Sequence, residues 1–210
     1  MLIPIEDVKK ILDSNNIDVT GVFHVGAHEC EELEAYKSLG IEPHNIVWID
    51  AIPSKVERAM QLGIPNVYHA VVSDGDDQMV EFHVSNNGQS SSLLEFGTHA
   101  QEHPGIVYVD TLQQRTTTID RFFQRTNFDP STYSFWNLDI QGAELMALRG
   151  AMQSLSHVKA LYLEVNEKEL YKGCALLPEM DAYLSSYNFK RVLTSMTPHG
   201  WGDALYILDK

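Results

Sequence analysis

The sequence predicts an α/β fold: a mostly parallel β-sheet of seven main strands with an antiparallel last strand and helices on both faces. Short apolar runs alternate along the chain with segments of helical periodicity, a pattern typical of βαβ units. The last two apolar runs are separated only by a short turn, so we expect them to pair antiparallel. With 210 residues, 44% of them hydrophobic, the chain is expected to form one domain, with an N-terminal helix in 1–20 and the core in 21–210.

Each predicted element of the first half is a short run with a clear period. Strands are predicted at 21–26, 45–51, 66–74 and 79–85. Helices are predicted at 4–16, 30–40, 54–63 and 116–126. Gly40 and Gly63 end two of these helices, as glycine commonly does. The polar stretch 86–105 has little periodicity and is expected to be a loop or lid.

The second half repeats the alternation. Strands are predicted at 134–142, 158–166, 189–196 and 204–210. Helices are predicted at 143–155 and 176–188. The turn TPHGWGD, residues 197–203, joins the last two strands.

The composition excludes two classes of partner. The formal net charge is −14, with 29 acidic and 15 basic residues, so a polyanion is repelled at long range. We therefore expect neither a nucleic-acid partner nor binding to an acidic membrane. Cys30 and Cys174 lie far apart without a CxxC spacing, no apolar leader is present, and no apolar stretch reaches the ~20 residues that span a bilayer. A soluble, cytoplasmic protein is expected.

The stretch GVFHVGAHECEE, residues 21–32, places a glycine turn between the first strand and the next helix, as in many folds that bind a nucleotide-like cofactor. A dinucleotide requires several glycines beside its pyrophosphate and a helix start free of negative charge. Here one glycine, Gly26, is followed by Glu29, Glu31 and Glu32. S-adenosylmethionine (SAM), a sulfonium cation without phosphate, fits this turn better, although acidic residues also stabilise a helix start through its dipole.

Acidic residues follow later strands. Asp50 lies 24 positions after Gly26, where a carboxylate accepts hydrogen bonds from ribose hydroxyls, and Asp74 can accept the adenine amine. Each has a structural alternative, as a helix N-cap for Asp50 and an Asp-Gly turn for Asp74. Because strand ends of an open α/β sheet meet at one rim, we expect these residues to lie there with Asp139 and Glu164.

Several segments resemble the FkbM family of SAM-dependent methyltransferases, from about Gly21 to the C-terminus. The resemblance is carried by FHVGAHECEE, VWIDAIPSKVERA, HAVVSDGDDQMVEFHVS, QSSSLL, TTTIDRFF, NLDIQGAELMALRGA and LYLEVN. The most specific segment, LDIQGAELMALRGA, is similar to the family's D-x-E-G-x-E-x-x-V-L-x-G-A block. The resemblance implies a Rossmann-like class I methyltransferase fold and usually O-methylation of sugars or other small molecules. The chain departs from the family at His24, at Glu29-Cys30 and at Gln141, where an acidic residue, a second glycine and a glutamate are usual.

The predicted site residues form three groups. The predicted cofactor-binding residues are His24, Gly26, Ala27, His28, Asp50, Ala51, Ser73, Asp74 and Asp139. The predicted substrate-binding residues are Ser91, Ser92, Gln141, Glu164, Asn166 and Trp201. The predicted catalytic residues are Asp139 and His199, because the proton of a sugar hydroxyl must leave as the methyl group is transferred. Asp139 has an alternative role as a helix N-cap, His199 and Trp201 have alternatives as surface residues, and Glu144 is expected to be a structural contact.

The favoured function is therefore SAM-dependent O-methylation of a monosaccharide, nucleotide sugar or glycan. A non-catalytic ligand-binding module with a degenerate methyltransferase fold is the alternative, and a nicotinamide-dependent oxidoreductase is disfavoured by the missing glycines. Among nine histidines, the pairs His24/His28 and His99/His103 do not match a zinc motif. No metal site is predicted, although a divalent ion held by Asp139 and Glu164 is left open, as is membership of a larger protein.

Overall fold

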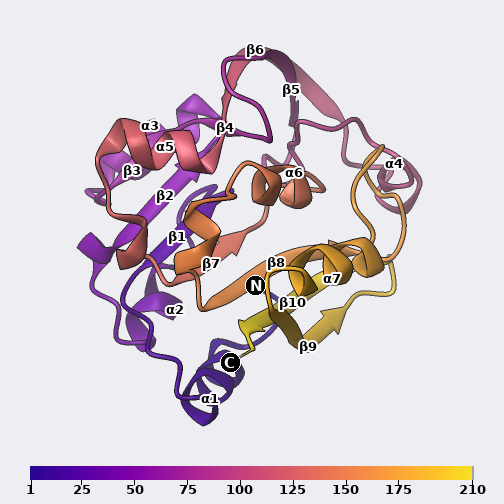
Figure 1. The fold of residues 1–210 in the computed structure, drawn as a ribbon. Helices are drawn as coiled ribbons and strands as arrows, with labels where there is room; N and C mark the ends of the chain where they lie inside the picture. Colours follow the sequence, from indigo (N-terminus) through magenta and orange to yellow (C-terminus); the bar gives the residue numbers. More distant parts are fainter. Residues whose placement is uncertain (210) are drawn as a thin grey trace.

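The computed structural model describes residues 1–209 (Figure 1). Its central sheet has seven strands in the order β3-β2-β1-β7-β8-β10-β9. The strands are β1 (Val22–Val25), β2 (Ile46–Asp50), β3 (Val67–His69), β7 (Phe135–Leu138), β8 (Ala160–Asn166), β9 (Phe189–Met196) and β10 (Trp201–Leu208). All pairs are parallel except those of β10, which is antiparallel to both β8 and β9. The predicted sheet with its antiparallel last strand is confirmed.

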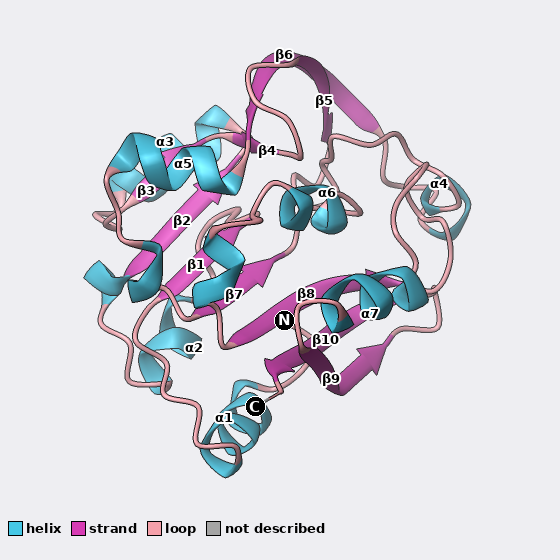
Figure 2. Ribbon diagram, viewed as in Figure 1, coloured by secondary structure: helices cyan, strands magenta, loops and turns pink. Residues whose placement is uncertain are grey.

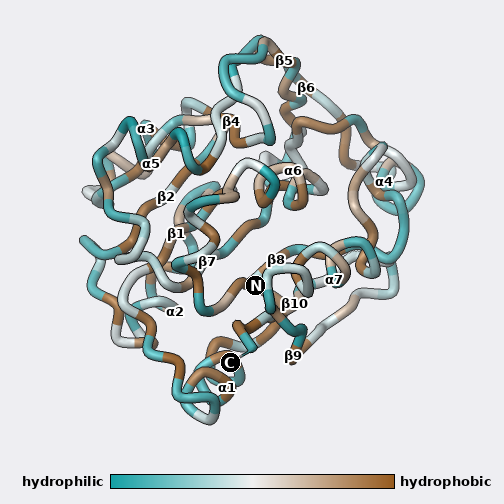
Figure 3. The backbone as a smooth tube through the Cα atoms, viewed as in Figure 1, coloured by the Kyte–Doolittle hydropathy of each residue, from teal (hydrophilic) through white to brown (hydrophobic). Residues whose placement is uncertain are grey.

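Helices cover both faces of this sheet (Figure 2). One face packs against α5 (Ile119–Thr126), α6 (Glu144–Arg149) and α7 (Leu177–Ser185), and the other against α1 (Ile5–Ser14), α2 (Leu33–Ser38) and α3 (Pro53–Gln61). Side chains alternate between these layers, since Phe23 of β1 packs in the first and Val22 in the second. The central strands are accordingly apolar on both faces, as the hydropathy colours of Figure 3 show.

A second, three-stranded sheet projects from the core beside the strand ends (Figure 1). It contains β4 (Val71–Val72), β5 (Met79–Ser85) and β6 (Tyr108–Thr117). The single strand predicted at 66–74 is wrong, because the chain breaks at Ala70 and β4 leaves the central sheet to pair with β6. The strand β6 was not predicted, because half of its residues are exposed and its exposed and less exposed positions do not alternate along the whole strand.

Other boundaries also differ from the prediction. The helix predicted at 30–40 begins only at Leu33, and the helix predicted at 143–155 ends at Arg149, before Gly150, a residue type unfavourable inside helices. The expected loop 86–105 contains a short helix, α4 (His99–Glu102). Strand β10 begins at Trp201, inside the predicted turn. Within residues 1–209, no helix combines the length and apolar character needed to cross a membrane.

Candidate active site

The turn after β1 is held by backbone bonds to the end of β2. The N–H groups of Gly26 and Ala27 both donate to the carbonyl of Ile49, at 2.8 and 3.0 Å. Gly26 has a φ of +92°, and a β-carbon there would lie 1.8 Å from the carbonyl oxygen of Asp139. Internal packing against the strand end of β7 therefore requires glycine at this position, whatever ligand the turn also holds.

The glutamates after Gly26 do not form the first turn of a helix, because α2 begins after them. Glu29 pairs with Lys55 at 2.7 Å, and Glu31 contacts Nδ1 of His28 at 2.7 Å. Glu31 and Glu32 line a cavity, whereas Glu29 does not. The helix-dipole interpretation of Glu29 and Glu31 is thus wrong. Of these three glutamates, only Glu31 and Glu32 contribute negative charge to the large cavity.

Asp50 joins two segments at the end of β2. Its Oδ2 accepts the N–H of His28 and its Oδ1 accepts the N–H of Ile52, both at 2.7 Å. Burial raises the pKa of Asp50, and these two bonds partly offset that effect. The residue flanking α3 on its N-terminal side is Ile52, so Asp50 does not act as that helix's N-cap. Each carboxylate oxygen keeps a lone pair for a ligand hydroxyl.

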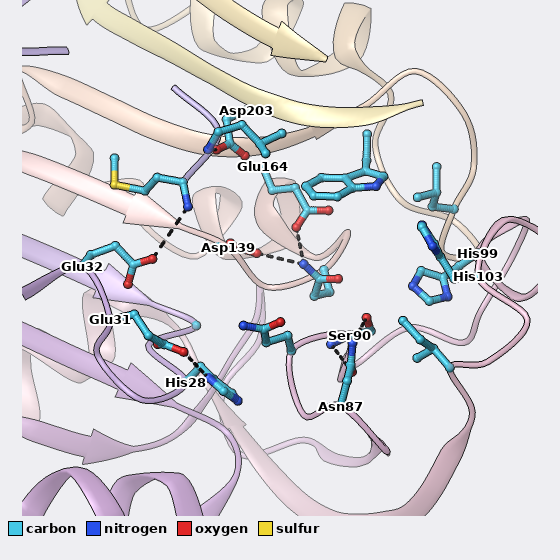
Figure 4. A pocket seen from close by; sticks show the side chains of 18 residues that line it. His28, Glu31, Glu32, Asn87, Ser90, His99, His103, Asp139, Glu164 and Asp203 are labelled. Atoms are coloured by element: carbon cyan, nitrogen blue, oxygen red, sulfur yellow. Dashed lines mark hydrogen bonds and ion pairs between the residues drawn. The ribbon is translucent and has the colours of Figure 1, made fainter. Parts of the chain in front are cut away.

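Two cavities adjoin at these strand ends. The apolar cleft, of about 50 Å³, lies between β1, β2 and β5 and is lined by Asp50, Ile52, Val72, Phe82, Ser91 and Leu93, among others. The large cavity, of about 460 Å³, is lined by residues that include Glu31, Glu32, Asp139, Glu164, Trp201 and Asp203. The two share Gly26, His28, Gln89 and Asp139. Figure 4 shows Glu31 and Glu32 on one side of the large cavity and His99 and His103 on the opposite side.

Gln141 lies between two carboxylates of the large cavity. Its Nε2 donates to Oδ1 of Asp139 at 2.9 Å and also to Oε2 of Glu164, while its Oε1 accepts the hydroxyl of Tyr171 at 2.5 Å. The amide is therefore used within the protein. The alternative of Asp139 as a helix N-cap is wrong, because Ala143 occupies that position without a side-chain bond.

Glu144 holds the backbone of the same turn, as expected for a structural contact. It is 2% exposed, and its Oε1 accepts the N–H groups of Ile140 and Gly142 at 2.9 and 3.2 Å. Burial raises the pKa of Glu144 to about 8, and the nearby charge of Asp139 adds to the shift. Glu144 therefore positions the turn that carries Asp139 and Gln141.

Two further carboxylates face the large cavity from β8 and β10. Glu164 and Asp203 are directly opposite each other in the antiparallel pair and are 3% and 4% exposed. Burial raises the pKa of both, and the charge of Asp139 raises it further. Asp203 accepts hydrogen bonds from the hydroxyl of Tyr162 and the N–H of Leu2. Like charges at opposed positions of a sheet destabilise it. This pair therefore lowers stability when both carboxylates are ionised and no cation lies beside them.

Several predicted cofactor residues lie outside both cavities. His24 is buried beneath the turn, where its Nδ1 is 3.0 Å from the hydroxyl of Tyr36 and its ring packs on Trp48. Burial lowers the pKa of His24, which is typical of a core histidine. Ala27, Ser73 and Asp74 line neither cavity, because the chain turns away from the cleft after Val72. Gly26, His28, Asp50, Ala51 and Asp139 do line the cleft.

Some predicted substrate and catalytic residues also lie elsewhere. Ser92 is fully buried and donates to the carbonyl of Gln141 at 2.8 Å, and Asn166 is buried away from both cavities. His199 lines neither cavity, since its Nδ1 bonds Glu102 at 3.0 Å outside the wall. Ser91 lines the cleft rather than the large cavity. Gln141, Glu164 and Trp201 do line the large cavity.

The sequence interpretation missed other lining residues. Asp203 was placed in a turn, although the alternation in WGDALYIL puts it on a strand beside Trp201. Asn87, Gln89 and Ser90 belong to the polar segment 86–105, in which only Ser91 and Ser92 were predicted to bind substrate. Nothing in the sequence distinguishes His99 and His103, which reach the cavity through α4.

The described residues contain no cluster of three or more His, Cys, Asp or Glu side chains arranged to hold a metal ion. Between Asp139 and Glu164, where a divalent ion was left open, the amide of Gln141 donates to both carboxylates. The position between these two carboxylates is thus occupied by the side-chain amide of Gln141.

Comparison with known proteins assigns the family. A family model described as the methyltransferase FkbM domain matches residues 18–191. The chain belongs to the FkbM methyltransferase family. This confirms the family expected from the sequence motifs. The match covers the turn after β1 and the apolar cleft, whereas Met1, Leu2, Trp201 and Asp203 of the large cavity lie outside it. Among curated proteins, none matches the chain significantly.

Solved structures similar to this FkbM chain have low sequence identity to it. A protein of the NADB-Rossmann superfamily from Streptococcus agalactiae is 11% identical, with a TM-score of 0.51 over 98% of this chain and 67% of that chain. A SAM-dependent methyltransferase from Aquifex aeolicus is 13% identical, with a TM-score of 0.47 over 99% and 91%. Magnesium protoporphyrin IX methyltransferase from Synechocystis PCC 6803, with bound SAM, is 11% identical, with a TM-score of 0.45 over 98% and 78%. The first of these supports a Rossmann-like fold.

Proposed function

We propose that the chain is a SAM-dependent methyltransferase that transfers the methyl group to a hydroxyl of a carbohydrate. Family membership supports methyl transfer. The observation that carries the proposal is the position of Asp139, which lines both the apolar cleft and the large cavity. A cofactor in one and an acceptor in the other would meet at this carboxylate.

The apolar cleft has the chemistry that adenosine requires. Ile52, Val72 and Phe82 supply apolar walls for a base, and Asp50 supplies acceptor oxygens for ribose hydroxyls at the end of β2. When bound, SAM would supply an electrophilic methyl group. The cleft of about 50 Å³ is well below the ~300 Å³ at which ligand pockets usually begin, so we propose that segment 86–93 shifts when the cofactor binds.

The large cavity has the size and lining of a site for a small polar molecule. Its volume of about 460 Å³ is within the usual range of ligand pockets. Asn87, Gln89 and Ser90 offer donors and acceptors for hydroxyl groups, and Trp201 offers an aromatic ring. These features support a carbohydrate acceptor over an apolar one.

Asp139 is the proposed base. Gln141 bonds its Oδ1 and leaves Oδ2 for the acceptor. Transfer would form a bond between the acceptor oxygen and the methyl carbon that SAM supplies, and the carbon–sulfur bond would break with its electron pair on sulfur. The hydroxyl proton leaves to Asp139 as the new bond forms, which contributes typically 10²–10⁴-fold to such reactions.

Calorimetric titration with SAM, S-adenosylhomocysteine and NAD tests the cofactor, because it requires no knowledge of the acceptor. We expect micromolar binding of the first two and none of NAD. Binding of NAD alone would favour an oxidoreductase. Absence of all binding at millimolar concentration would favour the ligand-binding module without catalysis.

A further inference from the structure

The inner wall of the large cavity is acidic without nearby lysine or arginine. Asp139, Glu164 and Asp203 come from adjacent strand ends of β7, β8 and β10. No lysine or arginine is among the lining residues of the described chain. The amino group of Met1 lies 3.9 Å from Glu32, and its charge also lowers the pKa of Asp203, while His28 contacts Glu31. The three inner carboxylates have only neutral hydrogen-bond donors, as described above.

A second feature of the wall, independent of the carboxylates, is a buried histidine nitrogen without a hydrogen-bond partner. His99 is 4% exposed, lines the cavity, and its Nδ1 has no hydrogen-bond partner within residues 1–209. Burial, helped by the nearby His103, lowers the pKa of His99 to about 4, so the ring is neutral at pH 7 and one nitrogen keeps a lone pair. The carboxylates accept in the same way, and Trp201 adds an aromatic face that attracts cations.

We propose that the acceptor carries a protonated amine, as an amino sugar does, and that Glu164 and Asp203 bind this ammonium group while Asp139 remains available to the hydroxyl. The inference rests on the proposed function and deepens it. The ammonium nitrogen has no lone pair, so a hydroxyl of the same molecule remains the group that is methylated. A phosphorylated acceptor, including a nucleotide sugar, is repelled by the same wall.

The positive charge of SAM does not explain the negative charge of the inner wall of the large cavity. The cofactor carries a sulfonium and an ammonium against one carboxylate, a net charge of about +1, whereas Glu164 and Asp203 lie one and two strands beyond the Asp139 that adjoins the cleft. Bringing a cation to Glu164 and Asp203 also relieves the repulsion between these opposed carboxylates.

The test uses compounds that share a hexose ring and differ at one substituent, which is cationic, neutral or anionic. Glucosamine, galactosamine and mannosamine are titrated against their N-acetyl forms, parent hexoses and hexose 6-phosphates at pH 6.5, with and without saturating S-adenosylhomocysteine. We expect at least one amine to bind about tenfold or more tightly than its N-acetyl form, as for a charged hydrogen bond, and no phosphate to bind. Equal affinities, a preference for phosphates, or no binding by any amine would overturn the proposal.

Variants locate the effect. Glu164→Gln and Asp203→Asn should each reduce the amine preference about tenfold, and Asp203→Glu, which keeps the charge, should restore part of it. Glu57→Gln and Asp110→Asn are matched controls, because they make the same changes at exposed residues. Both should leave the amine preference unchanged. Melting curves verify folding. A preference that survives both cavity variants would contradict ammonium binding.

The two proposals fail in different ways. If S-adenosylhomocysteine does not bind while the amine preference persists, the methyltransferase function fails and the cation site stands. If S-adenosylhomocysteine binds and amines show no preference, only the cation site fails.

Discussion

Replacing Gly26 by alanine separates two costs that the structure combines at the turn after β1. The φ of +92° disfavours any L side chain, and the new β-carbon would lie 1.8 Å from the carbonyl oxygen of Asp139. Gly40 is a matched control, because its φ is +86° and nothing lies within 4 Å of its β-carbon position. Gly40→Ala therefore reports the backbone cost alone, about 1–2 kcal/mol.

The overlap at Gly26 involves two backbones, so no flexible side chain can move aside to relieve it. Overpacking adds typically 1–3 kcal/mol, so Gly26→Ala should cost about 2–5 kcal/mol in total. For a domain of this size the loss corresponds to a fall in Tm of roughly 4–20 °C. Urea unfolding at pH 7 measures both variants. Equal losses for Gly26→Ala and Gly40→Ala would refute the close contact between β1 and β7 as the reason for glycine.

Three more predictions concern the 139–144 turn and its support. Asp139→Asn should lower kcat about 10²–10⁴-fold while calorimetry finds the SAM Kd within a few-fold; near-full turnover would remove Asp139 as the base. Since burial raises the pKa of Glu144 from 4.5 to about 8, the folded chain keeps a proton that the unfolded chain releases, and the free energy of unfolding should fall as pH rises between these values, by up to ~1.4 kcal/mol per pH unit. Denaturation at several pH values should show this slope, and Glu144→Gln should flatten it; an unchanged slope would contradict the assignment. Ser92→Ala should cost about 1–3 kcal/mol in urea unfolding, and no loss would return Ser92 to the list of ligand contacts.

The sequence predicts the parts of the fold in which local pattern and burial agree. Strands β1, β2, β7 and β8 are apolar on both faces and are bounded by turns, so their position and parallel pairing follow from the pattern alone. Strand β6 fails for the opposite reason, because half of its residues are exposed and its pairing with β5 and β4 makes it a strand. The break at Ala70 likewise depends on pairing between distant segments.

The candidate site divides in the same way. Gly26, Asp50 and Asp139 could be found because strand ends of an α/β sheet meet at one rim, which is a property of topology. His24 and Asn166 are polar residues on the correct strands, yet both are buried away from the cavities. Whether a strand residue faces a cavity depends on the direction of its side chain. The position of the residue near the end of a strand does not determine that direction.

Gln141 illustrates how a departure from the family pattern acquires a physical meaning. A glutamate at this position would place a further carboxylate beside Asp139 and Glu164, in a turn where Glu144 is also buried. The amide removes that charge and supplies two N–H donors, one for each neighbour, while its carbonyl accepts from Tyr171. The site thereby keeps Asp139 and Glu164 as hydrogen-bond acceptors. Both can then meet a ligand that brings positive charge, and the amide holds them in place while they do so.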